Sequence, residues 1–144
     1  TNGYSLARKV LLDKYEIGEY IEELGCSVDK ELLKKHKSYL HILSDIIDKP
    51  WLNALSHITG GGLIENTHRV LENNQDIKID WNSWEWPSIF KLIQNEGNIK
   101  FDDMIRPFNL GIGIVLIINK NNLNDLEAHL DNLNEKYYHI GEVI

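Results

Sequence analysis

The chain has 144 residues, of which 42% are hydrophobic and 26% are charged, as is usual for a globular protein. This length predicts one domain with a hydrophobic core of its own. The net charge of −7 argues against a surface for nucleic acid or for anionic membranes, because either partner requires clustered positive charge.

The first predicted element is an amphipathic helix over residues 5–15. Its apolar side chains form one stripe, and lysine and arginine side chains lie opposite. Ser5 precedes the stripe and is the predicted N-cap. Asn2 and Gly3 therefore lie at the entrance to this helix.

Residues 15–37 change from acidic to basic, and we expect helical pieces separated by Gly25. Cys26 is the only cysteine, so the chain has no internal disulfide bond and fits a reducing cytoplasm. No basic residue beside Cys26 would lower the pKa of its thiol, so we do not expect it to be a reactive nucleophile. We also expect no secretory segment.

A further helix is predicted over residues 39–48, where apolar residues recur at helical spacing before Pro50. His36 and His41 flank the start of this helix. Because they are five residues apart, they do not share a helix face, and we expect no metal site there.

The segment most suggestive of chemistry is a glycine turn between a short strand at residues 54–58 and a helix at residues 63–71. Gly60, Gly61 and Gly62 allow positive φ and a close approach of a ligand to the main chain. The N–H groups and dipole at the start of the helix suit a phosphate group. Alternatively, the glycines only make a tight turn. No Gly-Lys-Ser/Thr follows, which argues against a nucleotide P-loop.

A strand is predicted at residues 77–80, followed by a tryptophan cluster at Trp81, Trp84 and Trp86. Such rings could stack on bases, but the acidic residues among them would repel a nucleic-acid backbone. We therefore predict that this cluster packs in the core or under a lid.

The second half of the chain alternates helices and strands. Helices are predicted over residues 87–96, with Pro87 at the start and Gly97 at the end, over residues 101–108, and over residues 123–133. Residues 111–119 form a strand that is apolar on both faces, which predicts a central place in a sheet. Its apolar run is too short to span a membrane.

A final strand is predicted over residues 137–143. Helices and strands mix without regular βαβ alternation, so the predicted fold class is α+β, with a mixed β-sheet covered by helices.

Four strings in this sequence carry a resemblance to a known family. His-Ile-Thr-Gly-Gly-Gly-Leu-Ile-Glu-Asn at residues 57–66 resembles the signature of aminoimidazole ribonucleotide synthetase, the phosphoribosylformylglycinamidine cyclo-ligase. Residues 2–6, 108–113 and 140–143 resemble further strings of that family in the same order. The resemblance covers the chain from end to end and is to the family's C-terminal domain. The family's N-terminal ATP-binding domain has no counterpart here.

The resemblance implies a role in purine biosynthesis. ATP would phosphorylate the formamide oxygen of formylglycinamidine ribonucleotide, and a substrate nitrogen would then close the imidazole ring. ATP, magnesium and the homodimer contact would belong mainly to the N-terminal domain, so we predict that residues 1–144 alone do not hydrolyse ATP. The residues implied in substrate binding are Asn2, Gly3, Gly60, Gly61, Gly62, Asn66, Arg69 and Asn109.

Alternative roles exist for two of these residues. Asn66 could orient substrate amides or lie on a helix surface without a ligand. Arg69 could contact an anion or take part in a surface salt bridge. No residue of the chain is assigned to catalysis or to metal binding.

The sequence departs from the family before Tyr39, where the family commonly has Pro-Thr-Arg or Pro-Thr-Lys. Here the string is Lys35-His36-Lys37, so a phosphate contact would fall to Lys37, which is less suited than arginine to bidentate binding. The family also has a histidine just before the position of Thr1.

Two other functions remain open from the sequence. The chain could be a binding or regulatory module without chemistry. It could also belong to a related ATP-dependent synthetase, such as selenophosphate synthetase, or to the hydrogenase maturation protein. An acidic, glycine-rich nucleotide domain in a longer source chain would favour the cyclo-ligase.

Overall fold

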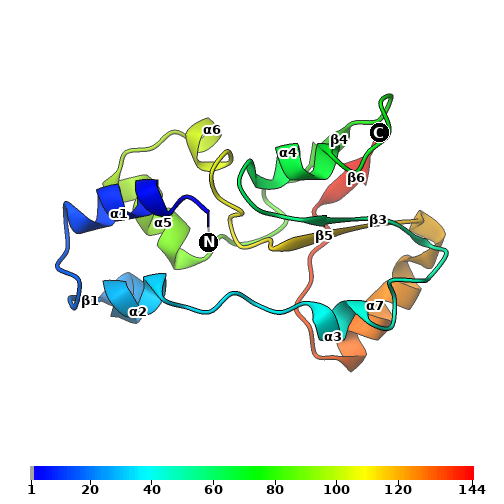
Figure 1. The fold of residues 1–144 in the computed structure, drawn as a ribbon, viewed down its shortest axis with the longest axis horizontal. Coiled ribbons are helices and arrows are strands. Elements are labelled where there is room, and N and C mark those ends of the chain that lie inside the picture. Colours follow the sequence, from blue (N-terminus) through cyan, green and yellow to red (C-terminus); the bar gives the residue numbers. More distant parts are fainter. Residues whose placement is uncertain (1) are drawn as a thin grey trace.

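The computed structural model describes residues 2–144, so Thr1 and its predicted family match lie outside the described residues. Helices and short antiparallel strands mix along the chain, and the predicted α+β class is confirmed (Figure 1). The helices are α1 (Tyr4–Leu12), α2 (Val28–Leu32), α3 (Leu40–Leu43), α4 (Gly62–His68), α5 (Ser88–Glu96), α6 (Phe101–Met104) and α7 (Leu123–Asn132). The strands are β1 (Tyr20–Ile21), β2 (Cys26–Ser27), β3 (Leu52–His57), β4 (Ile77–Ile79), β5 (Ile114–Ile118) and β6 (Gly141–Val143), and 3-10 turns lie at η1 (Glu22–Leu24) and η2 (Lys120–Asn122).

The strands do not join into one mixed sheet. They form three separate antiparallel pairs, β1 with β2, β3 with β5 and β4 with β6. Within residues 2–144, β5 pairs with β3 alone, so the predicted central position of this strand is wrong. Its two apolar faces have another cause: Val115 packs on the main core, and Leu116 and Ile118 pack on a second cluster.

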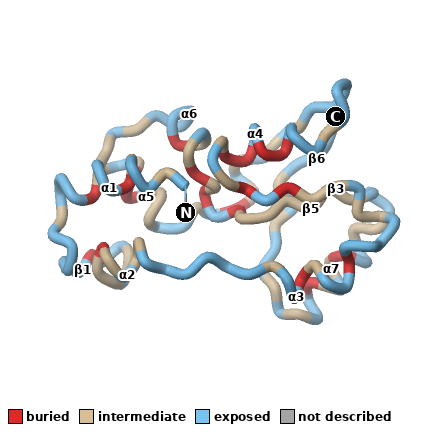
Figure 2. Tube along the Cα trace, in the orientation of Figure 1, coloured by how far each residue is buried: buried red, intermediate tan, exposed pale blue. Residues whose placement is uncertain are grey.

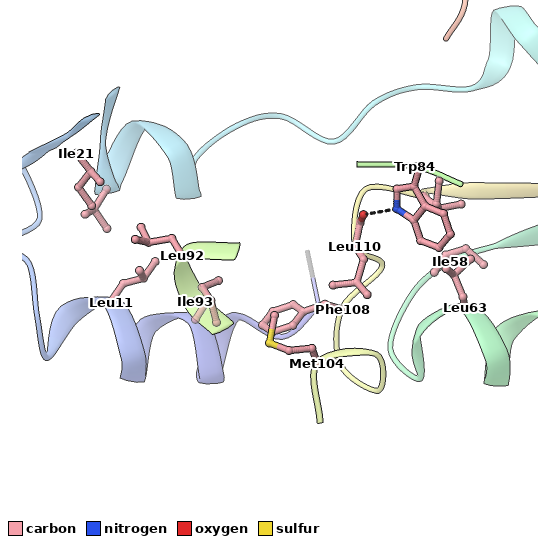
Figure 3. Packing of buried hydrophobic residues seen from close by; sticks show 13 residues of the cluster. Leu11, Ile21, Ile58, Leu63, Trp84, Leu92, Ile93, Met104, Phe108 and Leu110 are labelled. Carbon is pink, nitrogen blue, oxygen red and sulfur yellow. Dashed lines mark hydrogen bonds between the residues drawn. The ribbon is translucent and has the colours of Figure 1, made fainter. Parts of the chain in front are cut away.

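The main core lies between α1, α5 and the loop that follows α6 (Figure 3). Leu11, Ile93, Met104 and Leu110 are buried almost completely. Trp84 is buried beside them, and its indole Nε1–H donates a hydrogen bond of 2.9 Å to the Leu110 carbonyl. The prediction that the tryptophan cluster packs is therefore confirmed for Trp84.

The second core covers the other face of the β3–β5 pair, where α3 and α7 lie side by side (Figures 1 and 2). Its buried members are Ile42, Ile46, Leu126 and Leu130. Residues 34–39 run from α2 to α3 without regular secondary structure, and we call them the connecting segment.

Several predicted boundaries need correction. Helix α1 is shorter than residues 5–15, and its N-cap is Gly3 at φ 80° with no side-chain cap, so Ser5 is not the cap. Residues 15–37 include the β1–β2 hairpin as well as helical pieces, because Gly25 at φ 66° reverses the chain. The helices predicted at 39–48 and 101–108 are single helical turns followed by further turns, and α4 ends at His68.

Other predicted elements are confirmed with small changes. Helix α5 follows Pro87 and ends at Gly97, and α7 spans nearly the predicted residues. The last strand is limited to β6, which pairs with β4 through three residues (Gly141–Val143). Within residues 2–144, no helix combines the length and the hydropathy that crossing a membrane requires.

Candidate functional site

A cavity of about 180 Å³ lies where α1 and α5 meet the end of β3, the loop after α6 and the connecting segment. It brings together Asn2, Thr59 and Asn109, which come from three of the four strings that carry the family resemblance. The other lining residues are Tyr4, Ala7, Glu31, Leu32, Lys34, His36, Ile58, Ile89, Phe90, Ile93 and Phe108. Three predicted regions of the sequence therefore meet at one site.

The glycine turn, residues 59–62, follows β3 directly and borders this cavity through Thr59. Gly60 is exposed, and a Cβ added to it would lie 3.4 Å from Asn2 Oδ1, which places this glycine beside the start of the chain. Gly61 has φ +100° and Gly62 has φ +66°, values that favour glycine. Within residues 2–144, no hydrogen bond is found from the main-chain N–H of Gly60 or Gly61.

Gly62 has a different task from the other two glycines. It is buried, and a Cβ at this position would overlap the carbonyl oxygen of Ile105. Gly62 therefore lets α4 approach the segment that follows α6. The same close approach leaves little room for the predicted ligand contact at Gly62. The strand, turn and helix order is confirmed, although α4 has only seven residues.

Asn66 is the residue that holds the glycine turn in shape. Only 4% of it is exposed, so the alternative that it lies on a helix surface is wrong. Its Nδ2 group donates to the carbonyls of Gly62 at 2.8 Å and Gly60 at 3.1 Å, and Thr59 Oγ1 donates to its Oδ1 at 3.1 Å. This anchoring role was not predicted from the sequence, although an asparagine four residues after the last glycine of a turn can reach back to it.

Arg69 lies outside the cavity lining. Its guanidinium forms an ion pair with Glu65 one turn earlier in α4, and 57% of its side chain is exposed. It also donates a long hydrogen bond of 3.3 Å to Asn66 Oδ1. The surface salt bridge named as its alternative is therefore present, and such exposed pairs contribute little to stability.

Gly3 brings the string at residues 2–6 against the string at residues 108–113. Gly3 has φ +80°, and a Cβ on it would overlap the ring of Phe108. Asn109 Oδ1 accepts a hydrogen bond of 3.0 Å from the Gly111 N–H. Because that oxygen is occupied, the Asn109 Nδ2 group is the donor that remains for a ligand.

The basic residues that line the cavity are not the ones expected from the sequence. Lys37, the predicted phosphate contact, is not a lining residue, and its ammonium group forms an ion pair with Glu135. Glu135 also contacts His41 Nε2 at 2.7 Å. The Lys37 ammonium, followed by His41, lowers the pKa of the Glu135 carboxyl group. Lys34 and His36 line the cavity instead of Lys37.

The surroundings of Cys26 disfavour its thiolate form. Burial raises its pKa, and its hydrogen bond of 3.3 Å to the Glu31 carboxylate raises it further. Across residues 2–144, no three His, Cys, Asp or Glu side chains lie together in a group that could hold a metal ion.

Comparison with known proteins finds relatives over the whole chain. The family model described as "AIR synthase related protein, C-terminal domain" matches residues 1–144. A protein named phosphoribosylformylglycinamidine cyclo-ligase from Pseudothermotoga lettingae is 40% identical over the whole chain. Proteins of the same name from Alkaliphilus oremlandii and Thermodesulfovibrio yellowstonii are 39% and 42% identical over 100% and 99% of the chain.

The chain covers 42%, 43% and 42% of the length of these three relatives, in the order given. The family match, in contrast, extends over the full chain. The chain therefore belongs to the family of AIR synthase related protein C-terminal domains.

Proposed function

We propose that the full-length protein carrying this chain is an ATP-dependent phosphoribosylformylglycinamidine cyclo-ligase of purine biosynthesis, acting in the cytoplasm. It converts formylglycinamidine ribonucleotide to aminoimidazole ribonucleotide, and the cavity described above is part of its substrate site. The observation that carries the proposal is the meeting of Asn2, Thr59 and Asn109 in one cavity, because three distant strings converge there.

The glycine turn supplies the contact for the substrate phosphate. The N–H groups of Gly60 and Gly61 have no hydrogen-bond acceptor within residues 2–144, and Gly60 lies beside Asn2. Asn66 fixes the turn from behind through buried hydrogen bonds. A turn held in this way loses little conformational entropy when an anion binds, which favours affinity.

The polar side chains of the cavity suit the remainder of a ribonucleotide. The Nδ2 group of Asn109 can donate, and Asn2 and Thr59 offer donors and acceptors for amide and hydroxyl groups. A cavity of about 180 Å³ is below the usual range of complete ligand pockets, about 300–1,000 Å³. The chain therefore holds one part of the substrate, and residues elsewhere in the protein enclose the rest.

ATP and magnesium supply the phosphoryl group and its charge neutralisation when they are bound. The described residues do not fit a metal site, because they form no group of three or more metal-ligating side chains. We assign both cofactors, and the homodimer contact, mainly to the part of the protein outside residues 1–144. The role of the chain's own residues is to bind and orient the ribonucleotide.

The test is a steady-state assay of the full-length protein with ATP, magnesium and formylglycinamidine ribonucleotide. We expect ADP to form only with this substrate present and in step with aminoimidazole ribonucleotide. The isolated chain of residues 1–144 serves as the control and should release no ADP. Tight substrate binding by the full-length protein without ADP formation would contradict the proposal and favour a non-catalytic module.

Gly61→Ala tests the phosphate contact separately. The added methyl group meets the Glu65 side chain and strains a φ of +100°, at a cost of about 1–2 kcal/mol. We expect the full-length variant to stay folded and to lose substrate affinity. Free sulfate should also protect the wild type against thermal unfolding more than the variant. Equal protection and unchanged affinity would mean that the glycines only make a turn.

A further inference from the structure

We infer that His36 supplies the positive charge with which the cavity binds an anion, so that anion affinity in this protein depends on the protonation of one histidine. The inference rests on the proposed function, because it concerns the same cavity. It assigns a binding residue at a position where the chain departs from the family pattern of Pro-Thr-Arg or Pro-Thr-Lys.

The charges around the cavity carry the argument. Among the lining residues, Glu31 and Lys34 form an ion pair of 2.5 Å with each other. Their charges cancel, so with a neutral His36 the lining has no net charge. Protonation of His36 gives the cavity lining a net charge of +1. An anion that enters the cavity then meets the His36 cation, which has no carboxylate partner within residues 2–144.

The neighbouring lysines do not provide this charge. The Lys37 ammonium is held by Glu135, which also binds His41, and Lys37 does not line the cavity. Lys35 also lies outside the lining. Of the three residues Lys35, His36 and Lys37, only His36 lines the cavity.

The geometry of His36 leaves one ring nitrogen for a ligand. Its Nδ1 lies 2.8 Å from the main-chain carbonyl of Lys37, and a carbonyl only accepts, so Nδ1 carries a hydrogen. Among the described residues, no hydrogen bond is found to Nε2. Neutral Nε2 is an acceptor and repels an anion, whereas protonated Nε2–H donates to one.

Other titratable groups face this ring. The rings of His57 at the end of β3 and of Tyr39 before α3 meet it nearly edge-on, with centroids 5.3 Å and 6.2 Å away. From the cavity side, the lining adds the Lys34–Glu31 pair and the Tyr4 hydroxyl. His57 could bind the proton in place of His36, so the experiment must distinguish the two histidines.

Sulfate is the probe of choice, because its charge stays constant between pH 5.5 and 8, unlike that of a phosphate ester. Histidine is the side chain that ordinarily titrates in this interval. Calorimetric titration of the full-length protein at fixed ionic strength should show sulfate affinity falling about three- to tenfold from pH 5.5 to pH 8, as expected for one partly screened charge.

Four variants assign the effect. His36→Gln should bind sulfate weakly and nearly independently of pH. His36→Lys should restore tight binding and keep it at pH 8. His57→Gln and His139→Gln should retain the dependence of the wild type, the latter because His139 is exposed and does not line the cavity.

The outcomes separate this inference from the proposed function. An unchanged pH dependence in His36→Gln, or its loss in His57→Gln alone, overturns the role of His36 and leaves the anion site in place. If Gly61→Ala binds sulfate as the wild type does while His36→Gln does not, the phosphate contact at the glycine turn fails and His36 stands. No sulfate binding at any pH overturns both.

Discussion

The glycine turn and the connecting segment both line the cavity, but they are held by different forces. The glycine turn is fixed by the buried side chain of Asn66 and by the close approach of Gly62 to Ile105. The connecting segment is anchored through Lys37 to Glu135, an ion pair whose lysine side chain is 49% exposed. The shape of the glycine turn should therefore change little with pH or salt. The charges that hold the connecting segment should respond to both.

The packing beneath the cavity predicts the largest loss of stability. Trp84 is buried, and its indole holds the Leu110 carbonyl next to Asn109. We expect Trp84→Ala to lower the free energy of unfolding by about 3–5 kcal/mol, because it leaves a large void and an unpaired carbonyl. Chemical denaturation measures this loss.

The half-buried Trp81 offers the matched control. Its ring lies tilted against that of Trp84, with the centroids 5.6 Å apart, and Trp81→Ala should cost clearly less. An unchanged unfolding curve for Trp84→Ala combined with lost ligand binding would mean instead that the cluster is a recognition surface.

Gly62→Ala tests the packing that holds the glycine turn. The new methyl group would overlap the Ile105 carbonyl and would force alanine to adopt φ +66°. Strain and overpacking together should cost about 2–4 kcal/mol. Gly18→Ala is the control, because no atom lies within 4 Å of a Cβ there and its φ is ordinary. Equal melting temperatures for the two variants would contradict the assigned role of Gly62.

Asn66→Ala should separate the shape of the turn from its packing. The variant leaves the buried carbonyl of Gly62 and the partly buried carbonyl of Gly60 without this donor, which should cost about 1–3 kcal/mol. Sulfate affinity should fall as well, because the turn is no longer held. Asn74→Ala, at an exposed position, is the control. Retained affinity in Asn66→Ala would show that the turn keeps its shape without the asparagine.

The sequence could predict those parts of the fold that depend on local chemistry. Pro87 and Gly97 delimit α5 because they act on the backbone where they stand. The strand, glycine turn and helix order follows from residues 54–71 in the same way. Asn2 and Asn109, which come from two of the four strings, line the same cavity as Thr59 of the glycine turn.

The remaining features depend on distant partners, which periodicity does not reveal. The pattern of β5 is apolar on both faces because two cores cover it, not because strands flank it on both sides. The ion pair of Lys37 with Glu135 joins residues that are 98 positions apart. Residues near Lys37 in the sequence therefore gave no sign that its ammonium group is paired and does not face the expected phosphate. Asn66 likewise forms its hydrogen bonds to Gly60 and Gly62 only when the glycine turn has folded against it.

Glu135→Gln tests the ion pair that anchors the connecting segment and should have the smallest effect. Lys37 and His41 lower the pKa of Glu135 in the folded protein, so this carboxylate stabilises the fold above its unfolded pKa. That contribution disappears as the pH falls through the folded pKa. The variant should therefore melt slightly below the wild type at pH 7, and the difference should shrink as the pH falls below the ordinary glutamate pKa of about 4.3.

Salt sharpens this last test. High salt at pH 7 should also reduce the difference between Glu135→Gln and the wild type, because the Lys37 ammonium is exposed to solvent. By contrast, the difference between Asn66→Ala and the wild type should persist in salt, since its hydrogen bonds are buried. If Glu135→Gln had a large effect that neither salt nor acid removed, the connecting segment would be held by packing, and the contrast with the glycine turn would fail.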